Sequence, residues 1–403
     1  MTTALLNVQS KVSCPVGRIL QSGFSLIELM VAMVISLLIM GAILTLFLDV
    51  TRTNDEMAKT NIQIENGRFA IQLIADDLQH GGFWDGYIPA FDDLTAEDIP
   101  GDYPTAVPDP CANFSTWDLA YKNALLGMPV QVYPASAVPA GCTGLTDLQA
   151  NTDILVVRHA ATSTTASADF DANDVYFQPS FCSSSSYDYW LAQKAAFADF
   201  DWNRRDPSAA DGCSPGLQAG VRKYVAYIYY IRNYSVTAGD GIPTLMRAEF
   251  EDGVMASAQP LIDGVEGMIV ELGIDNRSDT GALVDYSAAV TWADPDNKDS
   301  PTNRGDGVPD EFDRCTSGQP CGVDQLANVV AAKIYLLVRA SDASSGYTDG
   351  KSYTLGSSGV KDAAGATVAP YSYTPSGASQ KYQRHVYATT VRLNNVSARR
   401  ETP

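Results

Sequence analysis

The sequence has few of the side chains that carry catalysis. Its three histidines, His80, His159 and His385, lie far apart in different expected elements. The zinc-protease motif HExxH, the P-loop and the dinucleotide-binding motif GxGxxG are absent. The sequence therefore predicts a protein that works by packing, needs no cofactor and is not an enzyme.

Positive charge is also scarce. The chain has 27 Lys and Arg residues against 47 Asp and Glu, which gives a formal net charge of -20. Because an acidic surface repels phosphate backbones, direct binding of nucleic acid is not expected. Hydrophobic residues make up 45% of the 403 residues, which is enough for a sizeable core.

The seven cysteines lack the CxxC spacing of a zinc site. Cys14 precedes the long apolar run, and six follow it: Cys111, Cys142, Cys182, Cys213, Cys315 and Cys321. An even number of widely spaced cysteines beyond a membrane favours disulfides in an oxidising compartment over buried free thiols. We favour the pairs Cys111–Cys142, Cys182–Cys213 and Cys315–Cys321, because each encloses one irregular stretch and short loops close at low entropic cost. The spacing leaves other connectivities open.

One long apolar run, residues 24–48, lies near the N-terminus. As a helix it would be roughly 38 Å long, enough to cross a hydrocarbon core of about 30 Å. Residues 1–23 contain Lys11 and Arg18 but no acid, which favours a cytoplasmic N-terminus. A secretory signal peptide is shorter and places its small-residue cleavage site after the apolar stretch, whereas Gly23 comes before it.

Glu28 is the only ionisable residue in that run. A carboxylate at the centre of a bilayer costs on the order of 2.5 to 3.5 kcal/mol, so it usually has a partner and a function. An ordinary signal anchor with a chance glutamate is the plain alternative.

Residues 23–44, GFSLIELMVAMVISLLIMGAIL, resemble the N-terminal signal of type IV prepilins. The resemblance implies that a prepilin peptidase cuts after Gly23 and methylates the new amine on Phe24. It also implies that Glu28 neutralises the N-terminal amine of a neighbouring subunit as helices pack into a filament.

The helical pattern continues beyond the apolar run. Met57, Ile64, Ile71 and Leu78 recur every seven residues up to about residue 79, and Gly81-Gly82 then breaks the helix. This stripe predicts an amphipathic half-helix that packs on a sheet. A coiled-coil stalk also fits the repeat, but the repeat covers too few heptads to favour it.

The rest of the chain predicts an antiparallel sheet interrupted by large loops. Runs rich in β-branched and aromatic residues are expected as strands at 153–160, 174–179, 223–236, 244–252, 261–275, 327–341 and 384–396. Irregular insertions are expected at 83–150, 181–216, 276–325 and 342–381. The fold class is therefore α+β.

Four segments resemble landmarks of the PilW family of type IV minor pilins: GRFAIQLIADDLQHGGF (67–83), LIDGVEGMIVELGID (261–275), VVAAKIYLLVRAS (329–341) and RHVYATTVRLNNV (384–396). The resemblance implies a pilin-like fold with a long N-terminal helix packed on an antiparallel head. Its expected parts are a leader peptide (1–23), a transmembrane and filament-core helix (24–48), an amphipathic helix (49–80) and a head with insertions (81–403).

The resemblance also implies a function in assembly. The protein is expected to prime and cap a type IV pilus that serves surface attachment and twitching motility. Expected partners are other minor pilins, the major pilin, the prepilin peptidase, the inner-membrane assembly machinery and a tip adhesin. The expected location is the inner membrane, with the head periplasmic, and then the pilus tip. The alternatives are a J-type pseudopilin of a type II secretion system and a membrane-anchored adhesin or hydrolase that keeps its leader.

One acidic turn, residues 303–313, is a candidate calcium site. Asp306 and Asp310 flank Gly307, and alternating carboxylates around a glycine turn can surround a hard cation with oxygens. The preceding ligand positions hold Arg304 and Thr302, so the sequence favours a solvated acidic turn over a metal site.

Overall fold

The computed structural model describes residues 23–180, 182, 188–206, 208 and 213–401. Most of the expected leader, with Lys11, Cys14 and Arg18, lies outside the described residues. The chain divides into two compact units, residues 1–57 and 58–403. Each unit is described by itself.

The first unit contains the beginning of a long helix, α1 (Leu26–His80). Every side chain from Phe24 to Val50 is exposed, and most are large and apolar. The helix is long and apolar enough to cross a membrane. The sequence therefore correctly predicts an apolar N-terminal helix, whose side chains lack a covering surface among the described residues.

The second half of α1 packs in the second unit. Its buried residues are Gln63, Gly67, Ala70, Ile74 and Leu78. The predicted stripe is therefore wrong in its first part: Met57 is 59% exposed and Ile64 is 39% exposed. In an ideal helix, residues seven positions apart are rotated by about 20° relative to each other. Because Leu78 faces the core, positions one or more heptads before it turn progressively away from the core.

The first sheet is built around β7 (Arg222–Arg232), which pairs with β2, β3 and β8. All pairings in this sheet are antiparallel. Its other strands are β1 (Val130–Pro134), β2 (Asp153–Ala160), β3 (Tyr176–Pro179), β4 (Tyr189–Ala192), β8 (Thr244–Glu251), β9 (Val254–Met255) and β10 (Gln259–Asp263).

The second sheet has the order β12-β11-β13-β16 and is also antiparallel. Its strands are β11 (Val265–Ile274), β12 (Glu311–Asp313), β13 (Val329–Arg339) and β16 (Arg384–Arg392). The single strand expected at 261–275 is in fact two strands in different sheets. Gly264 separates them with φ 84°, a conformation that costs glycine little and other residues more.

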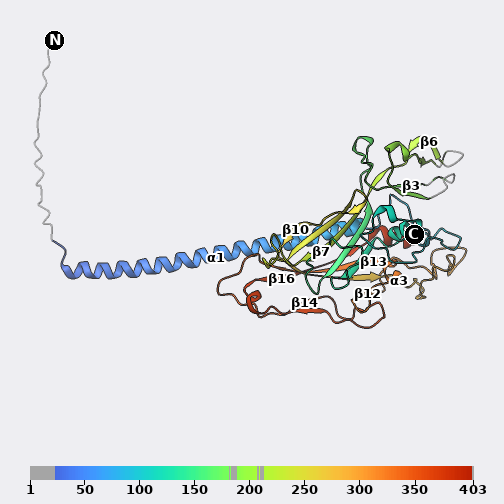
Figure 1. Cartoon of the computed structure of the whole chain (residues 1–403). Coiled ribbons are helices and arrows are strands. Elements are labelled where there is room, and N and C mark those ends of the chain that lie inside the picture. The colour runs from blue at the N-terminus through green and yellow to red at the C-terminus, as the bar shows by residue number, and fades with distance from the viewer. Residues whose placement is uncertain (1–22, 181, 183–187, 207, 209–212, 402–403) are drawn as a thin grey trace, which may run out of the picture. The chain divides into compact units, whose positions relative to one another are not determined.

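One hydrophobic core joins the two sheets to the second half of α1, beside which their strands lie (Figure 1). It contains Ile74 and Leu78 of the helix, Leu155 and Val157 of the first sheet, and many residues of the second sheet, where β11 is buried along its whole length. A buried polar contact also crosses between the sheets: Val270 N–H donates to Asp153 Oδ2 at 2.9 Å.

The expected insertions contain more regular structure than the sequence predicts. Residues 83–150 hold α2 (Leu119–Gly127) and β1, which were expected to be irregular. Two hairpins add β5 (Asn203–Arg205) with β6 (Cys213–Gln218), and β14 (Tyr353–Leu355) with β15 (Tyr371–Tyr373). Two short helices complete the described fold, α3 (Val323–Leu326) and α4 (Asn394–Arg400), together with 3₁₀ turns at 90–92, 114–116, 167–169, 197–199 and 377–381.

Asp153 gives the fold a predicted pH dependence. Burial raises the pKa of this carboxyl to about 7, against the opposing effect of Arg314. An unfolded aspartate titrates near pH 3.9, about three units lower. The folded state therefore keeps a proton that the unfolded chain releases, and stability falls as the pH rises from about 4 through 7.

We predict that Asp153→Asn gains stability relative to the native chain as the pH rises from 5 to 8, because asparagine carries no buried charge. Thermal unfolding of the full chain in detergent at several pH values measures the difference in Tm. A difference that stays constant or shrinks across this range contradicts the prediction.

Candidate assembly site

The N-terminus of α1 is closed by a reciprocal pair of hydrogen bonds between Ser25 and Glu28. The Ser25 backbone N–H donates to Glu28 Oε2 at 2.9 Å, and the Glu28 N–H donates to Ser25 Oγ at 3.2 Å. This is a capping box, which satisfies two backbone donors that the first helical turn leaves without intrahelical partners. Glu28 therefore has a local partner that the sequence analysis missed, although the pattern S-x-x-E before an apolar run signals it.

The capping box uses one of the two carboxylate oxygens. Among the residues that the structure describes, no hydrogen bond involves Oε1 of Glu28, and the side chain is exposed. Phe24, Glu28 and Ala32 line the same shallow groove on the helix surface. The arrangement leaves a carboxylate oxygen open beside an apolar strip, where a cationic group on another helix can reach it.

The opposite end of α1 is held by the C-terminal helix. The Asn395 side-chain amide of α4 donates to the carbonyls of Gln79, His80 and Gly81 at 3.0 to 3.4 Å. These are carbonyls that the last helical turn leaves without partners. The helix ends at His80, and Gly82 then adopts φ 75°.

Arg400 of α4 lies in the interior among oxygen acceptors. Its guanidinium pairs with Asp92 at 2.8 Å and with Asp275 at 3.2 Å, and it donates to Asn328 Oδ1 at 3.0 Å. All three charged side chains are at most 2% exposed. A buried ion pair of this kind is costly to break from one side, because the remaining charge is left without compensation.

The structure gives the calcium candidates another role. Asp310 Oδ2 accepts the N–H groups of Asn276 and Arg277 at 3.0 and 2.8 Å. Asp306 Oδ1 accepts the Val308 N–H at 2.9 Å, while the Asp306 N–H itself donates to Asp275. Burial raises the pKa of Asp310. These carboxylates therefore stabilise the turn through backbone N–H groups, whereas calcium binding at the turn has no support from this geometry.

Three disulfides join the six distal cysteines. They link Cys111 to Cys142, Cys182 to Cys213 and Cys315 to Cys321, the same sequence-local pairs that we favour from the sequence. The cysteines are 31 positions apart in the first two pairs and 6 positions apart in the third.

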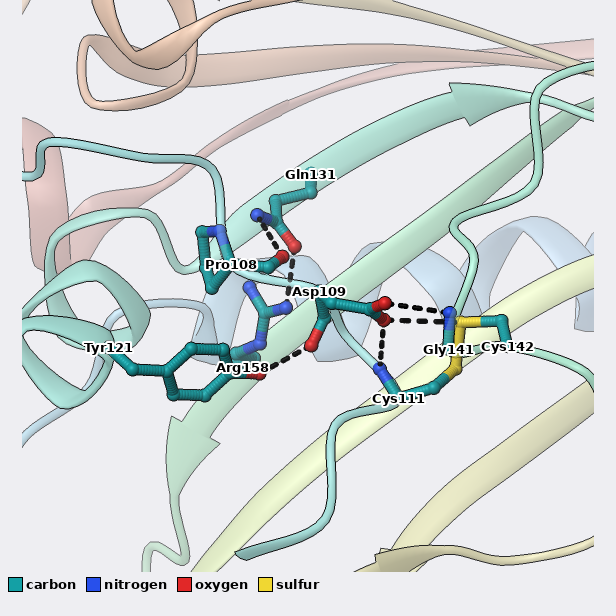
Figure 2. Close-up of a disulfide and its surroundings, with 8 residues drawn as sticks. All are labelled: Pro108, Asp109, Cys111, Tyr121, Gln131, Gly141, Cys142 and Arg158. Atoms are coloured by element: carbon teal, nitrogen blue, oxygen red, sulfur yellow. Dashed lines mark hydrogen bonds between the residues drawn. A yellow bond between two sulfur atoms is a disulfide. The ribbon is translucent and has the colours of Figure 1, made fainter. Parts of the chain in front are cut away.

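Asp109 organises the surroundings of the first disulfide (Figure 2). Its carboxylate accepts the Cys111 N–H at 3.0 Å and the Gly141 N–H at 2.7 Å, and the Tyr121 hydroxyl donates to its carbonyl. The ligand atoms of Asp109, Cys111 and Cys142 lie within 4.8 Å of one another, but the disulfide uses both sulfur atoms. The carboxylate and the disulfide thus fix two loop ends side by side.

Two of the three histidines meet in space, which the sequence does not predict. The rings of His80 and His159 lie 5.6 Å apart. His159 Nδ1 is 2.9 Å from the Ala160 carbonyl, and burial lowers the pKa of His159. The Tyr229 hydroxyl donates a hydrogen bond to the nearby Asp77 carboxylate, and burial raises the pKa of Asp77. These contacts pack the end of α1 against the first sheet. His385 lies elsewhere, against Tyr387.

Two family models match the chain. Residues 228–395 match the model described as type IV pilus-assembly protein W, PilW. Residues 18–44 match the prokaryotic N-terminal methylation motif. These matches support a type IV minor pilin of the PilW family.

The two matches cover complementary parts of the chain. The PilW match runs from β7 into α4 and so includes the whole second sheet. The methylation motif includes Gly23, Phe24 and Glu28. No curated protein and no solved structure matches the chain.

The disulfide pairs carry a prediction about stability. Removing the Cys111–Cys142 bond with the double variant Cys111→Ser, Cys142→Ser should lower the free energy of unfolding by about 2 to 5 kcal/mol. Removing Cys315–Cys321 should cost less, because its closed loop is shorter and constrains the unfolded chain less.

Chemical denaturation of the full chain in detergent measures both losses, and non-reducing peptide mapping checks the pairing. Crossed pairs or free thiols in the native chain would overturn the assignment. An equal or larger loss from the short loop would overturn the predicted order.

Proposed function

We propose that this pilin primes the assembly of a type IV pilus and caps its tip, after cleavage between Gly23 and Phe24 and methylation of the Phe24 amine. In this proposal residues 1–23 are the leader, 24–48 are the membrane and filament-core helix, 49–80 connect it to the head, and 81–403 are the head. The single observation that carries the proposal is the exposed apolar half of α1, headed by Glu28 inside a methylation motif.

The open oxygen of Glu28 requires a partner once the helix lies in hydrocarbon. An ionised carboxylate that enters hydrocarbon requires a compensating charge and hydrogen bonds. The capping box supplies one donor from Ser25. The charged amine that cleavage creates on the Phe24 of a neighbouring subunit would supply the second donor together with the opposite charge. The pairing would therefore fix the axial position of one helix against the next.

The head supports a position at the tip. It carries long loop segments and three stretches closed by disulfides, and in the first two the cysteines are 31 positions apart. A subunit in the shaft must present matching contacts to neighbours above and below it, and large loops make such repetition harder. The PilW match favours a pilus over a secretion pseudopilus.

Glu28 and Ser25 allow the charge to be tested separately from the helix cap. Glu28→Gln keeps an acceptor for the Ser25 N–H but removes the charge. Ser25→Ala removes the hydroxyl half of the cap and keeps the charge. We predict that Glu28→Gln lowers incorporation of the chain into pili by about tenfold or more, because a neighbour's amine is left unpaired.

Ser25→Ala is the matched control and should be incorporated nearly as well as the native chain. Quantitative immunoblotting of sheared pili measures incorporation, and the mass of the membrane-bound chain shows whether processing is retained. Normal incorporation of Glu28→Gln would contradict the charge-pairing role. An equal loss in Ser25→Ala would also contradict this role, because that variant keeps the charge.

A further inference from the structure

Strand β16 has an open edge. It pairs with β13 on one side and ends the second sheet on the other. Ala340 N–H donates to the Gln383 carbonyl, and Leu393 N–H donates to the Val330 carbonyl. In an antiparallel pair, hydrogen-bonded and non-hydrogen-bonded residue pairs alternate, so these two bonds show which residues of β16 bond to β13. By this alternation the odd-numbered residues of β16 bond to β13, while Val386, Ala388 and Thr390 direct their backbone N–H and C=O groups outward.

Those outward groups are without hydrogen-bond partners in the described part of the chain. One face of the strand is covered by α1, and the other is covered only around Val386. Tyr387 packs against α1, where a Cβ at position 67 would overlap its ring, and Val386 packs against the β14–β15 hairpin. Ala388 and Thr390 are exposed. The strand is therefore held in its sheet, but its edge can accept a further strand.

A cationic groove lies beside the start of β16. It has a volume of about 500 Å³ and is lined by α1, the 347–351 segment and β16. Its exposed basic residues are Arg68, Lys351 and His385, and none of its lining residues is Asp or Glu. Arg384 also lines it, but its guanidinium is already paired with Glu266 and Asp349.

This distribution is unusual in a chain with a net charge of -20. Residues 363–400 contain no Asp or Glu, although acids outnumber bases in the whole chain by 47 to 27. β16 lies inside this acid-free stretch. The open edge and the cationic groove thus occupy the same part of the head.

We propose that β16 is a docking strand that receives an extended, acidic segment of another pilus subunit. Naming a pilus subunit as the partner rests on the proposed function. The outward N–H and C=O groups of β16 recur every second residue, and another extended backbone can form hydrogen bonds with them. This mode of binding is strand addition. Carboxylates on the incoming segment would lie against Arg68, Lys351 and His385, which sets the direction and identity of the partner.

Two kinds of variant separate the backbone contacts from the charges. Ala388→Pro removes an outward N–H without removing a bond to β13, and Ala388→Val is its matched control. The double variant Arg68→Glu, Lys351→Glu reverses the charge of the groove. Its control, Arg204→Glu, Arg205→Glu, reverses two exposed arginines on β5 in another sheet.

The test places a photo-crosslinking benzophenone amino acid at Thr390 of the full chain in piliated cells, and at Val236, which is 88% exposed, as a control site. Mass spectrometry identifies the crosslinked peptide. We expect an acidic segment of another pilus subunit at Thr390 and no such product at Val236. The yield should fall by about tenfold in Ala388→Pro and in the groove variant, the equivalent of one or two lost hydrogen bonds or charge pairs, and stay unchanged in both controls.

Crosslinks to this chain itself, to a second copy of it or to a protein outside the pilus overturn the proposal. Unchanged yields in both Ala388→Pro and the groove variant also overturn it. Incorporation into sheared pili is measured in the same strains. If the chain enters pili but Thr390 gives no product, the docking strand fails and the proposed function stands; if the native chain never enters pili, both fail.

Discussion

Helix α1 is one continuous helix, but its two halves have different surroundings. From Leu26 to Leu48 its surface is exposed, and it is apolar apart from Glu28, Ser36 and Thr45. From Gln63 onward it presents a narrow buried face that includes Gly67 and Ala70. Small residues let a helix approach a sheet closely, and the ring of Tyr387 occupies the space that a side chain at Gly67 would need. The sheets can therefore cover the second half while the first half stays available to other helices.

The last residues of the chain stabilise this arrangement. Asn395 satisfies carbonyls at the end of α1, and Arg400 joins Asp92 to Asp275 in the interior. Asp275 in turn accepts the N–H groups of Asp306 and Gly307. One buried arginine thus connects the C-terminal helix, the loop after α1 and the acidic turn. The acidic turn is tied to this network through the N–H groups of Asp306 and Gly307.

The sequence predicts the main elements because their patterns are local. The apolar helix, the break at Gly81-Gly82 and the strands β2, β7, β8, β13 and β16 all follow from apolar runs, β-branched residues and glycine. The break between β10 and β11 is harder to predict, since Gly264 is one glycine inside an otherwise continuous apolar run. β1 and α2 are also missed, because Asp109, Tyr121 and the disulfide that fix their surroundings come from separate parts of the sequence.

The candidate site was predicted only in part. Glu28 stands out because it is a charge within an apolar run. The same residue also caps the helix through Ser25, and this local pattern was not predicted. The open edge of β16 depends on which strand ends the sheet, and strand order is not encoded by any one segment. The cationic groove is assembled from α1, a loop and β16, so its charge appears only in the fold.

We expect the exposed half of α1 to become a filament helix after processing of the chain. The decisive measurement is the mass of the mature N-terminal peptide, isolated from membranes and from pili. The mature chain should begin at Phe24 with one methyl group on its amine, and the chain should stay uncut when Gly23 is replaced by a bulky residue. A mature protein that retains Met1 or Cys14, or that begins after the apolar run, would contradict it.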